Sequence, residues 1–116
     1  MRYLPLIGLL LTAAASAQTW RELGPAPTSG FSGAAGRISA IACSATNPDL
    51  YFVGAADGGV WRTTDGGTTW AALTDHMPTT AIGAIALDPL NPATIYAGTG
   101  EANFANHSRY GMGLLK

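Results

Sequence analysis

The chain has 116 residues, a formal net charge of −1 and only 11% charged side chains. Without a surplus of Lys and Arg it is not a nucleic-acid-binding protein of the usual kind, because contact with phosphates requires a basic stripe. Cys43 is the single cysteine, which excludes an internal disulfide. It lies in an apolar run, so we expect a small buried side chain there.

The first 17 residues have the order of features found in a secretory signal peptide. Arg2 supplies a positive charge, residues 4–12 form an apolar run, and residues 15–17 (ASA) place small side chains where a signal peptidase cleaves. The apolar run is too short to cross a bilayer. We therefore expect residues 1–17 to be removed, the mature chain to be secreted into the periplasm or the medium, and no transmembrane segment in the mature part.

After the expected cleavage site the sequence predicts strands and turns. Residues 18–35 contain a short strand-like piece at 20–23, followed by a loop rich in Gly, Pro and Ser. From residue 36 onward, short runs of β-branched and aromatic residues are separated by Gly, Asn-Pro and Asp-Gly. No window shows the spacing of an amphipathic helix. The first unit is expected to form strands at about 37–43, 50–55, 59–63 and 69–73.

A sequence repeat organises this region. Residues 38–43 (ISAIAC) align with 82–87 (IGAIAL) at an offset of 44, and after ten extra residues 59–62 (GVWR) align with 113–116 (GLLK). A period in the forties with four strands per unit is typical of β-propeller blades. We therefore expect an all-β fold with a first blade at 36–80 and an incomplete second blade at 81–116, about one and three-quarters blades in all.

The first strand of each unit is apolar at consecutive positions, which predicts burial on both faces at the inner edge of a blade. A propeller needs roughly four to eight blades to close. Fewer blades would leave apolar faces and unpaired edges in water. We therefore expect the chain to be the N-terminal piece of a longer protein whose remaining blades complete the same propeller. Self-assembly of short chains into a ring is the alternative.

Residues 63–70 (TTDGGTTW), here called the octet, form the most distinctive turn. Asp65 is expected to accept hydrogen bonds from backbone N–H groups two residues on. The two glycines are expected to adopt backbone angles that other residues avoid, and Trp70 to anchor the turn with a buried ring. The predicted structural residues are Thr63, Asp65, Gly67, Thr69 and Trp70.

The octet matches the Asp-box, Ser/Thr-x-Asp-x-Gly-x-Thr-Trp. Together with residues 54–62 and 96–111, it resembles the opening blades of secreted bacterial Asp-box (BNR) repeat β-propellers, which are sortilin-like and described as glycosyl-hydrolase-like. The resemblance covers residues 36–116 and implies the propeller fold. The motif is shared by sialidases, xyloglucan-cleaving enzymes, sortilin-type receptors and plant photosystem assembly factors, so it does not define an activity.

The resemblance implies one catalytic candidate, Asp57. In xyloglucanase-type Asp-box glycosidases a catalytic aspartate occupies an Asp-x-Gly-Gly-x-aromatic-Arg segment, and residues 57–62 (DGGVWR) are similar but one residue shorter. An inverting glycosidase needs a second carboxylate roughly 6.5–9.5 Å away, and the sequence assigns none. The alternative is that Asp57 and Gly58 form an ordinary hairpin turn.

The ten extra residues create a second candidate, a loop at 101–111, because long loops of such folds often carry binding sites. A solvated polar loop is the alternative, and the spacing of its residues matches no metal motif. Arg37 and Arg62 are further arginines for a sialidase-like cluster, although Arg37 can equally pair with a nearby acid. The predicted ligand-binding residues are Glu101, Asn103, His107, Arg109 and Tyr110.

These observations lead to three functional hypotheses. The first is a non-catalytic recognition or scaffold module, without cofactor or metal, that binds a protein, peptide or glycan through its loops. The second is a glycoside hydrolase of the xyloglucanase-like type that acts on polysaccharide, with Asp57 as one of its two carboxylates. The third is an ectodomain coupled to a downstream peptidase or anchoring domain.

Overall fold

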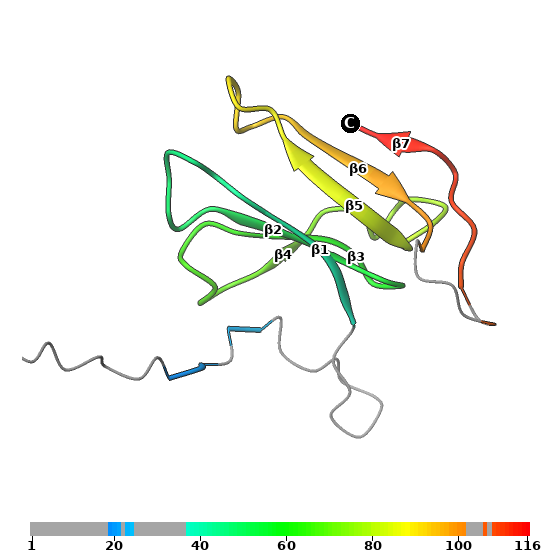
Figure 1. The fold of residues 1–116 in the computed structure, drawn as a ribbon, viewed down its shortest axis with the longest axis horizontal. Helices are drawn as coiled ribbons and strands as arrows, with labels where there is room; N and C mark the ends of the chain where they lie inside the picture. Colours follow the sequence, from blue (N-terminus) through cyan, green and yellow to red (C-terminus); the bar gives the residue numbers. More distant parts are fainter. Residues whose placement is uncertain (1–18, 22, 25–36, 102–105, 107) are drawn as a thin grey trace, which may run out of the picture.

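A computed structural model describes residues 19–21, 23–24, 37–101, 106 and 108–116. Within these ranges the chain forms two antiparallel sheets and no helix, which confirms the all-β prediction (Figure 1). The strands of sheet A, in spatial order, are β1 (Ile38–Cys43), β2 (Tyr51–Ala55), β3 (Gly59–Thr63) and β4 (Ala71–Ala72). Those of sheet B are β5 (Ile82–Leu87), β6 (Ile95–Thr99) and β7 (Leu114–Leu115).

The predicted strands agree with the observed ones except at two places. β4 is shorter than the predicted 69–73, because the N–H of Thr69 donates to the Asp65 carboxylate at 2.8 Å and is not free to enter a ladder. The predicted strand at 20–23 is wrong for the residues described there, none of which is in a strand. Trp20 in that segment is fully exposed. The expected signal peptide lies outside the described residues.

The two sheets repeat each other in register as well as in sequence. Ile41 lies opposite Val53 in sheet A, and Ile85 lies opposite Ala97 in sheet B, each 44 residues further along the chain. Both first strands also carry a bulge or irregularity one residue after they begin. The sequence repeat is therefore a structural repeat, down to the position where the ladder is interrupted.

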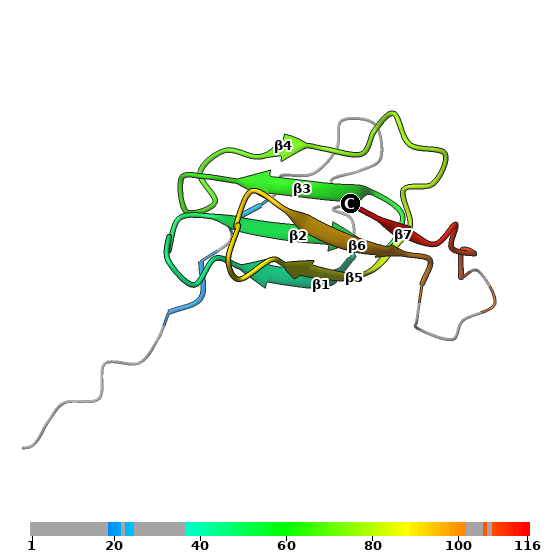
Figure 2. The same cartoon turned by 90° about the horizontal axis from the view of Figure 1, so that it is seen from above.

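Sheet B packs with one face on sheet A, and the core lies between them (Figure 2). Gly54 on β2 makes this close approach possible, because a Cβ atom at that position would lie 2.5 Å from Cγ2 of Ile82. Real Cβ atoms do not approach other atoms so closely, so a side chain here would force the sheets apart. The buried core residues are Phe52 and Val60 from sheet A and Ile82 and Ala97 from sheet B.

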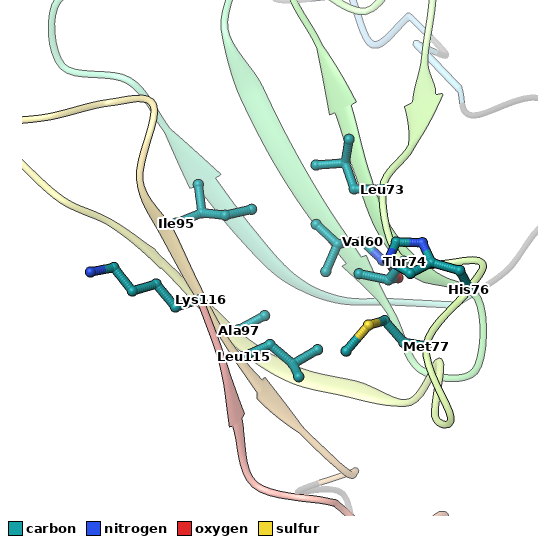
Figure 3. Close-up of a pocket in the computed structure, with 9 residues that line it drawn as sticks. All are labelled: Val60, Leu73, Thr74, His76, Met77, Ile95, Ala97, Leu115 and Lys116. Carbon is teal, nitrogen blue, oxygen red and sulfur yellow. Dashed lines mark hydrogen bonds between the residues drawn. The ribbon is translucent and has the colours of Figure 1, made fainter.

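The sheets are closest where β5 lies against β1 and β2, and they diverge toward their outer strands (Figure 1). The divergence leaves a cavity of about 240 Å³ between them. Figure 3 shows Val60 and Leu73 on one side of it and Leu115 on the other, whereas the side chain of Lys116 points away. Its lining consists of Val60, Leu73, Thr74, His76, Met77, Ile95, Ala97, Leu115 and Lys116.

The expectation that β1 is buried on both faces is wrong. Its residues are exposed or half-buried, and Ile41 is 63% exposed. Cys43 is a free, exposed cysteine rather than a buried one. The reason is that sheet B covers only one face of sheet A, and no other described strand covers the second face.

No helix within the described ranges is long and apolar enough to span a membrane.

Candidate functional site

The antiparallel connections divide the loops between two ends of the sheets. One end, here called the octet end, carries the β1–β2 loop, the octet and the β5–β6 loop. The opposite end carries the start of β1, the β2–β3 turn, the linker at 73–81 and the β6–β7 loop. The predicted structural motif and those predicted functional residues that the structure describes therefore lie at opposite ends of the sheets.

The octet is held by a network around the Asp65 carboxylate. Oδ1 accepts the hydroxyl of Thr63 at 2.8 Å and the backbone N–H of Thr69 at 2.8 Å, while Oδ2 accepts the hydroxyl of Thr69 at 2.6 Å. The bonds from the Thr69 hydroxyl and backbone, followed by the bond from Thr63, lower the pKa of Asp65 from 3.8 to about 2.

The prediction that Asp65 accepts a hydrogen bond from the backbone N–H two residues on, that of Gly67, is wrong. The N–H of Gly67 donates to the Thr63 hydroxyl at 2.9 Å instead, and that hydroxyl donates its own hydrogen bond to Asp65. Thr63 is 1% exposed, so its buried hydroxyl is satisfied in both directions. Threonine therefore mediates between the carboxylate and the turn backbone.

The glycines and the tryptophan of the octet take the roles expected of them, except that the Trp70 ring is less buried than predicted. Gly66 and Gly67 have φ angles of 68° and 89°, in the left-handed region that favours glycine. Trp70 is half-buried, and its indole N–H donates to the carbonyl oxygens of Leu23, at 2.9 Å, and Gly67, at 3.2 Å. With all these groups committed to the turn, the octet is a structural element.

Asp57 lies at the opposite end, on the turn between β2 and β3. The linker holds this turn, because Gly59 donates its N–H to the Thr80 carbonyl at 2.7 Å and the Thr80 hydroxyl donates to the Asp57 carbonyl at 3.3 Å. The side chain of Asp57 faces the β6–β7 loop. Its Oδ2 accepts a hydrogen bond from Nε of Arg109 at 3.3 Å.

Glu101 is the second carboxylate at this end, and it is almost enclosed, with a side chain only 4% exposed. It forms an ion pair with Arg37, and its Oε2 accepts the N–H of Arg109 at 3.2 Å. The backbone N–H of Glu101 also donates to the Arg109 carbonyl at 3.1 Å. Glu101 therefore fastens the β6–β7 loop to the start of β1 and does not present its carboxylate to solvent.

Together these four residues, Arg37, Asp57, Glu101 and Arg109, form what we call the charge cluster. Two come from each repeat unit, and their formal charges cancel. Arg109 joins the two carboxylates, through its backbone to Glu101 and through its side chain to Asp57. The sequence names all four residues, but the pairs lie 64 and 52 positions apart along the chain, which no local pattern reveals.

The remaining predicted residues are only partly brought together. Tyr110 follows Arg109 and is 95% exposed. Asn103 and His107 lie outside the described residues. Arg62, on β3, lies opposite Phe52 of β2 and next to the octet. It is therefore at the other end of the sheets from Arg37 and Arg109. In the part of the chain that the structure describes, no group of three or more His, Cys, Asp and Glu side chains could hold a metal ion.

Comparison of the chain with protein-family models, with curated proteins and with solved structures found no significant match.

Proposed function

We propose that the chain forms the opening blades of a secreted Asp-box β-propeller that acts as a non-catalytic recognition or scaffold module. Its ligand is a protein, a peptide or a glycan, bound at the end of the sheets that carries the charge cluster. The observation that carries the proposal is the meeting of the β2–β3 turn and the β6–β7 loop through Asp57 and Arg109, with Tyr110 exposed beside them.

Three features support the propeller. The strand registers repeat at a fixed offset, the two sheets lie face to face, and they converge at their first strands (Figure 1). Two neighbouring blades around a central channel form a wedge of this kind, because their inner strands lie close together and their outer strands lie further apart. Secretion is supported by the charge, apolar run and small residues of positions 1–17.

The surroundings of the carboxylates favour recognition over catalysis. Glu101 is enclosed and paired with Arg37, and Asp57 is bound by Arg109, so both take part in holding the loops. The most accessible groups are the Arg109 side chain, 66% exposed, and Tyr110, 95% exposed, while the side chains of Asp57 and Arg37 are 57% and 50% exposed. A guanidinium binds carboxylates through paired hydrogen bonds, and an exposed tyrosine offers a flat apolar face with a hydroxyl at its edge. Acidic glycans and acidic peptides suit this combination.

Binding of the purified chain to panels of immobilised oligosaccharides and peptides tests the proposal. We expect the variants Arg109→Ala and Tyr110→Ala to weaken binding about tenfold or more, since residues of these types dominate many interfaces. Arg62→Ala is the matched control, because it removes an exposed arginine at the octet end. Equal loss in the control, or unchanged binding in both site variants, would contradict the proposed site.

A glycoside hydrolase remains the second candidate, because Arg109 contacts both Asp57 and Glu101 and a second carboxylate therefore lies at the same end of the sheets as Asp57. Such an enzyme would need the Glu101 carboxylate to be released from Arg37 and opened to the substrate. Release of reducing sugar from polysaccharides such as xyloglucan, abolished by both Asp57→Asn and Glu101→Gln, would favour this candidate. Binding without sugar release would favour the recognition module.

A further inference from the structure

Each sheet has one face in the core and one face, here called the free face, with no described strand against it. Side-chain alternation and strand register assign the residues of each face. On sheet A the free face includes Ile38 and Ile41, which are exposed, Val53 and Ala55, which are buried, and Cys43, Tyr51 and Trp61. On sheet B it consists of Ala84, Ala86, Tyr96, Gly98 and Leu114.

The repeat relates these free faces to the faces that already pack together. Ile38, Ile41 and Val53 are the repeat equivalents of Ile82, Ile85 and Ala97, which sheet B presents to sheet A. The free face of sheet A is therefore built like the face with which sheet B docks. By the same repeat, the free face of sheet B is built like the face of sheet A that receives it. Ala84, Tyr96 and Gly98 replace Ala40, Phe52 and Gly54 at an offset of 44, and Leu114 replaces Val60 at an offset of 54.

The glycines show this complementarity most clearly. Ile82 packs directly on Gly54, where no Cβ would fit. At Gly98, the equivalent position on sheet B, an added Cβ would meet only the Cβ of Ala84, at an ordinary 3.6 Å. Gly98 therefore leaves an open notch. The residue suited to it by the repeat is Ile38, which is 39% exposed on the free face of sheet A, beside Ile41.

We infer that the free face of sheet A docks on the free face of sheet B of a second copy of this chain, in the geometry that joins sheets A and B within one copy. The two surfaces are different, so the contact is head-to-tail rather than two-fold symmetric. Burial of the exposed isoleucines favours it, because contiguous exposed apolar patches mark interaction sites. The inference needs no ligand, and it makes a second copy of this chain, rather than later blades of one chain, the source of the sheets that cover these faces.

Sedimentation velocity of the purified chain over a range of concentrations tests this inference. The wild-type chain is expected to form dimers and larger species as its concentration rises. Gly98→Val fills the notch of sheet B, and Ile41→Lys places a charge on the free face of sheet A. Each variant alone is expected to stay monomeric, at least tenfold weaker in self-association than the wild type. Ala93→Val, which adds the same kind of bulk to the exposed β5–β6 loop, is the control and is expected to associate normally.

Mixing the two variants separates head-to-tail contact from other modes. Gly98→Val retains an intact sheet A face, and Ile41→Lys retains an intact sheet B face, so an equimolar mixture is expected to form a 1:1 dimer and nothing larger. Self-association of either variant at the wild-type level would overturn the inference, because it would require contact between like faces. A wild-type chain that is monomeric at all concentrations would also overturn it and would leave a different partner as the occupant of these faces.

Discussion

Asp65 illustrates how one carboxylate can be committed to a turn. Its two oxygens accept three hydrogen bonds from Thr63 and Thr69, and these bonds require the ionised form. This explains why the pKa of Asp65 falls to about 2 although the side chain is exposed. An aspartate in this state organises the backbone and has no proton to donate near neutral pH.

The depressed pKa of Asp65 predicts a specific loss of stability in acid. Because the pKa is about 2 in the folded chain and 3.8 for an unperturbed aspartate, the contribution of Asp65 to stability is present above pH 4 and is lost as the pH falls toward 2. Asp65→Asn is expected to be less stable than wild type at pH 7, and the difference is expected to shrink between pH 4 and pH 2. Denaturant unfolding at pH 7, 4 and 2.5 measures it, and a difference independent of pH would contradict the assigned network.

At this scale the sequence predicts local contacts well and distant ones poorly. The octet identifies Asp65, Thr63 and Thr69 because their bonds stay within four residues. The ion pairs of Arg37 with Glu101 and of Arg109 with Asp57 join residues that only the folded repeat brings together. The sequence therefore names the members of the charge cluster without their partners.

Among the elements, the strands follow from composition and punctuation, whereas their burial does not. β1, β2, β3 and β5 form where β-branched and small apolar residues run between turn signals. The exposure of β1 has another cause, since burial depends on what packs against a strand. A continuous apolar run predicts two covered faces, and the described chain supplies one covering sheet.

The two repeat-related glycines predict opposite responses to the same substitution. Gly54→Val is expected to cost about 2–3 kcal/mol of unfolding free energy, because the new side chain overlaps Ile82 and overpacking separates the sheets. Gly98→Val is expected to change stability by no more than about 0.5 kcal/mol, because the space beside it is open. Urea unfolding of dilute, monomeric chains compares them.

Equal destabilisation by the two glycine substitutions would mean that the sheets do not meet at Gly54 as described. A useful companion is Gly54→Val combined with Ile82→Ala, which removes the side chain that occupies the same space. Partial recovery of the unfolding free energy in the double variant would locate the clash between these two residues, as non-additivity does for residues in contact.

Across the whole molecule, contacts at one end join the two repeat units. Arg37 pairs with Glu101, and Gly59 and Gly100 donate their N–H groups to the linker carbonyls of Thr80 and Ala81. The sequence repeat predicts the two units and their boundaries. The expected propeller also places the second unit against the first, but the sequence does not reveal that the two sheets meet at Gly54.

Ser39 adds a contact between the sheets that predicts how firmly they hold together. Its hydroxyl lies beside the carbonyl oxygens of Gly54, at 2.9 Å, and of Ile82 on sheet B. Ser39→Ala is expected to raise amide hydrogen exchange along β5 by about fivefold, which corresponds to one net hydrogen bond of about 1 kcal/mol. Exchange measured by mass spectrometry tests this, with β3 as the internal reference, and equal protection along β5 in both proteins would refute it.

The repeat equivalent of Ser39 on sheet B is Gly83, which has no hydroxyl. A sheet that stacks on sheet B therefore lacks this hydrogen bond, whereas sheet B itself is tied to its neighbour by Ser39. A stack of such units is consequently stronger at one junction than at the next. On warming or mild denaturation the copies would separate from one another before the two sheets of one copy part, so a single serine decides which junction opens first.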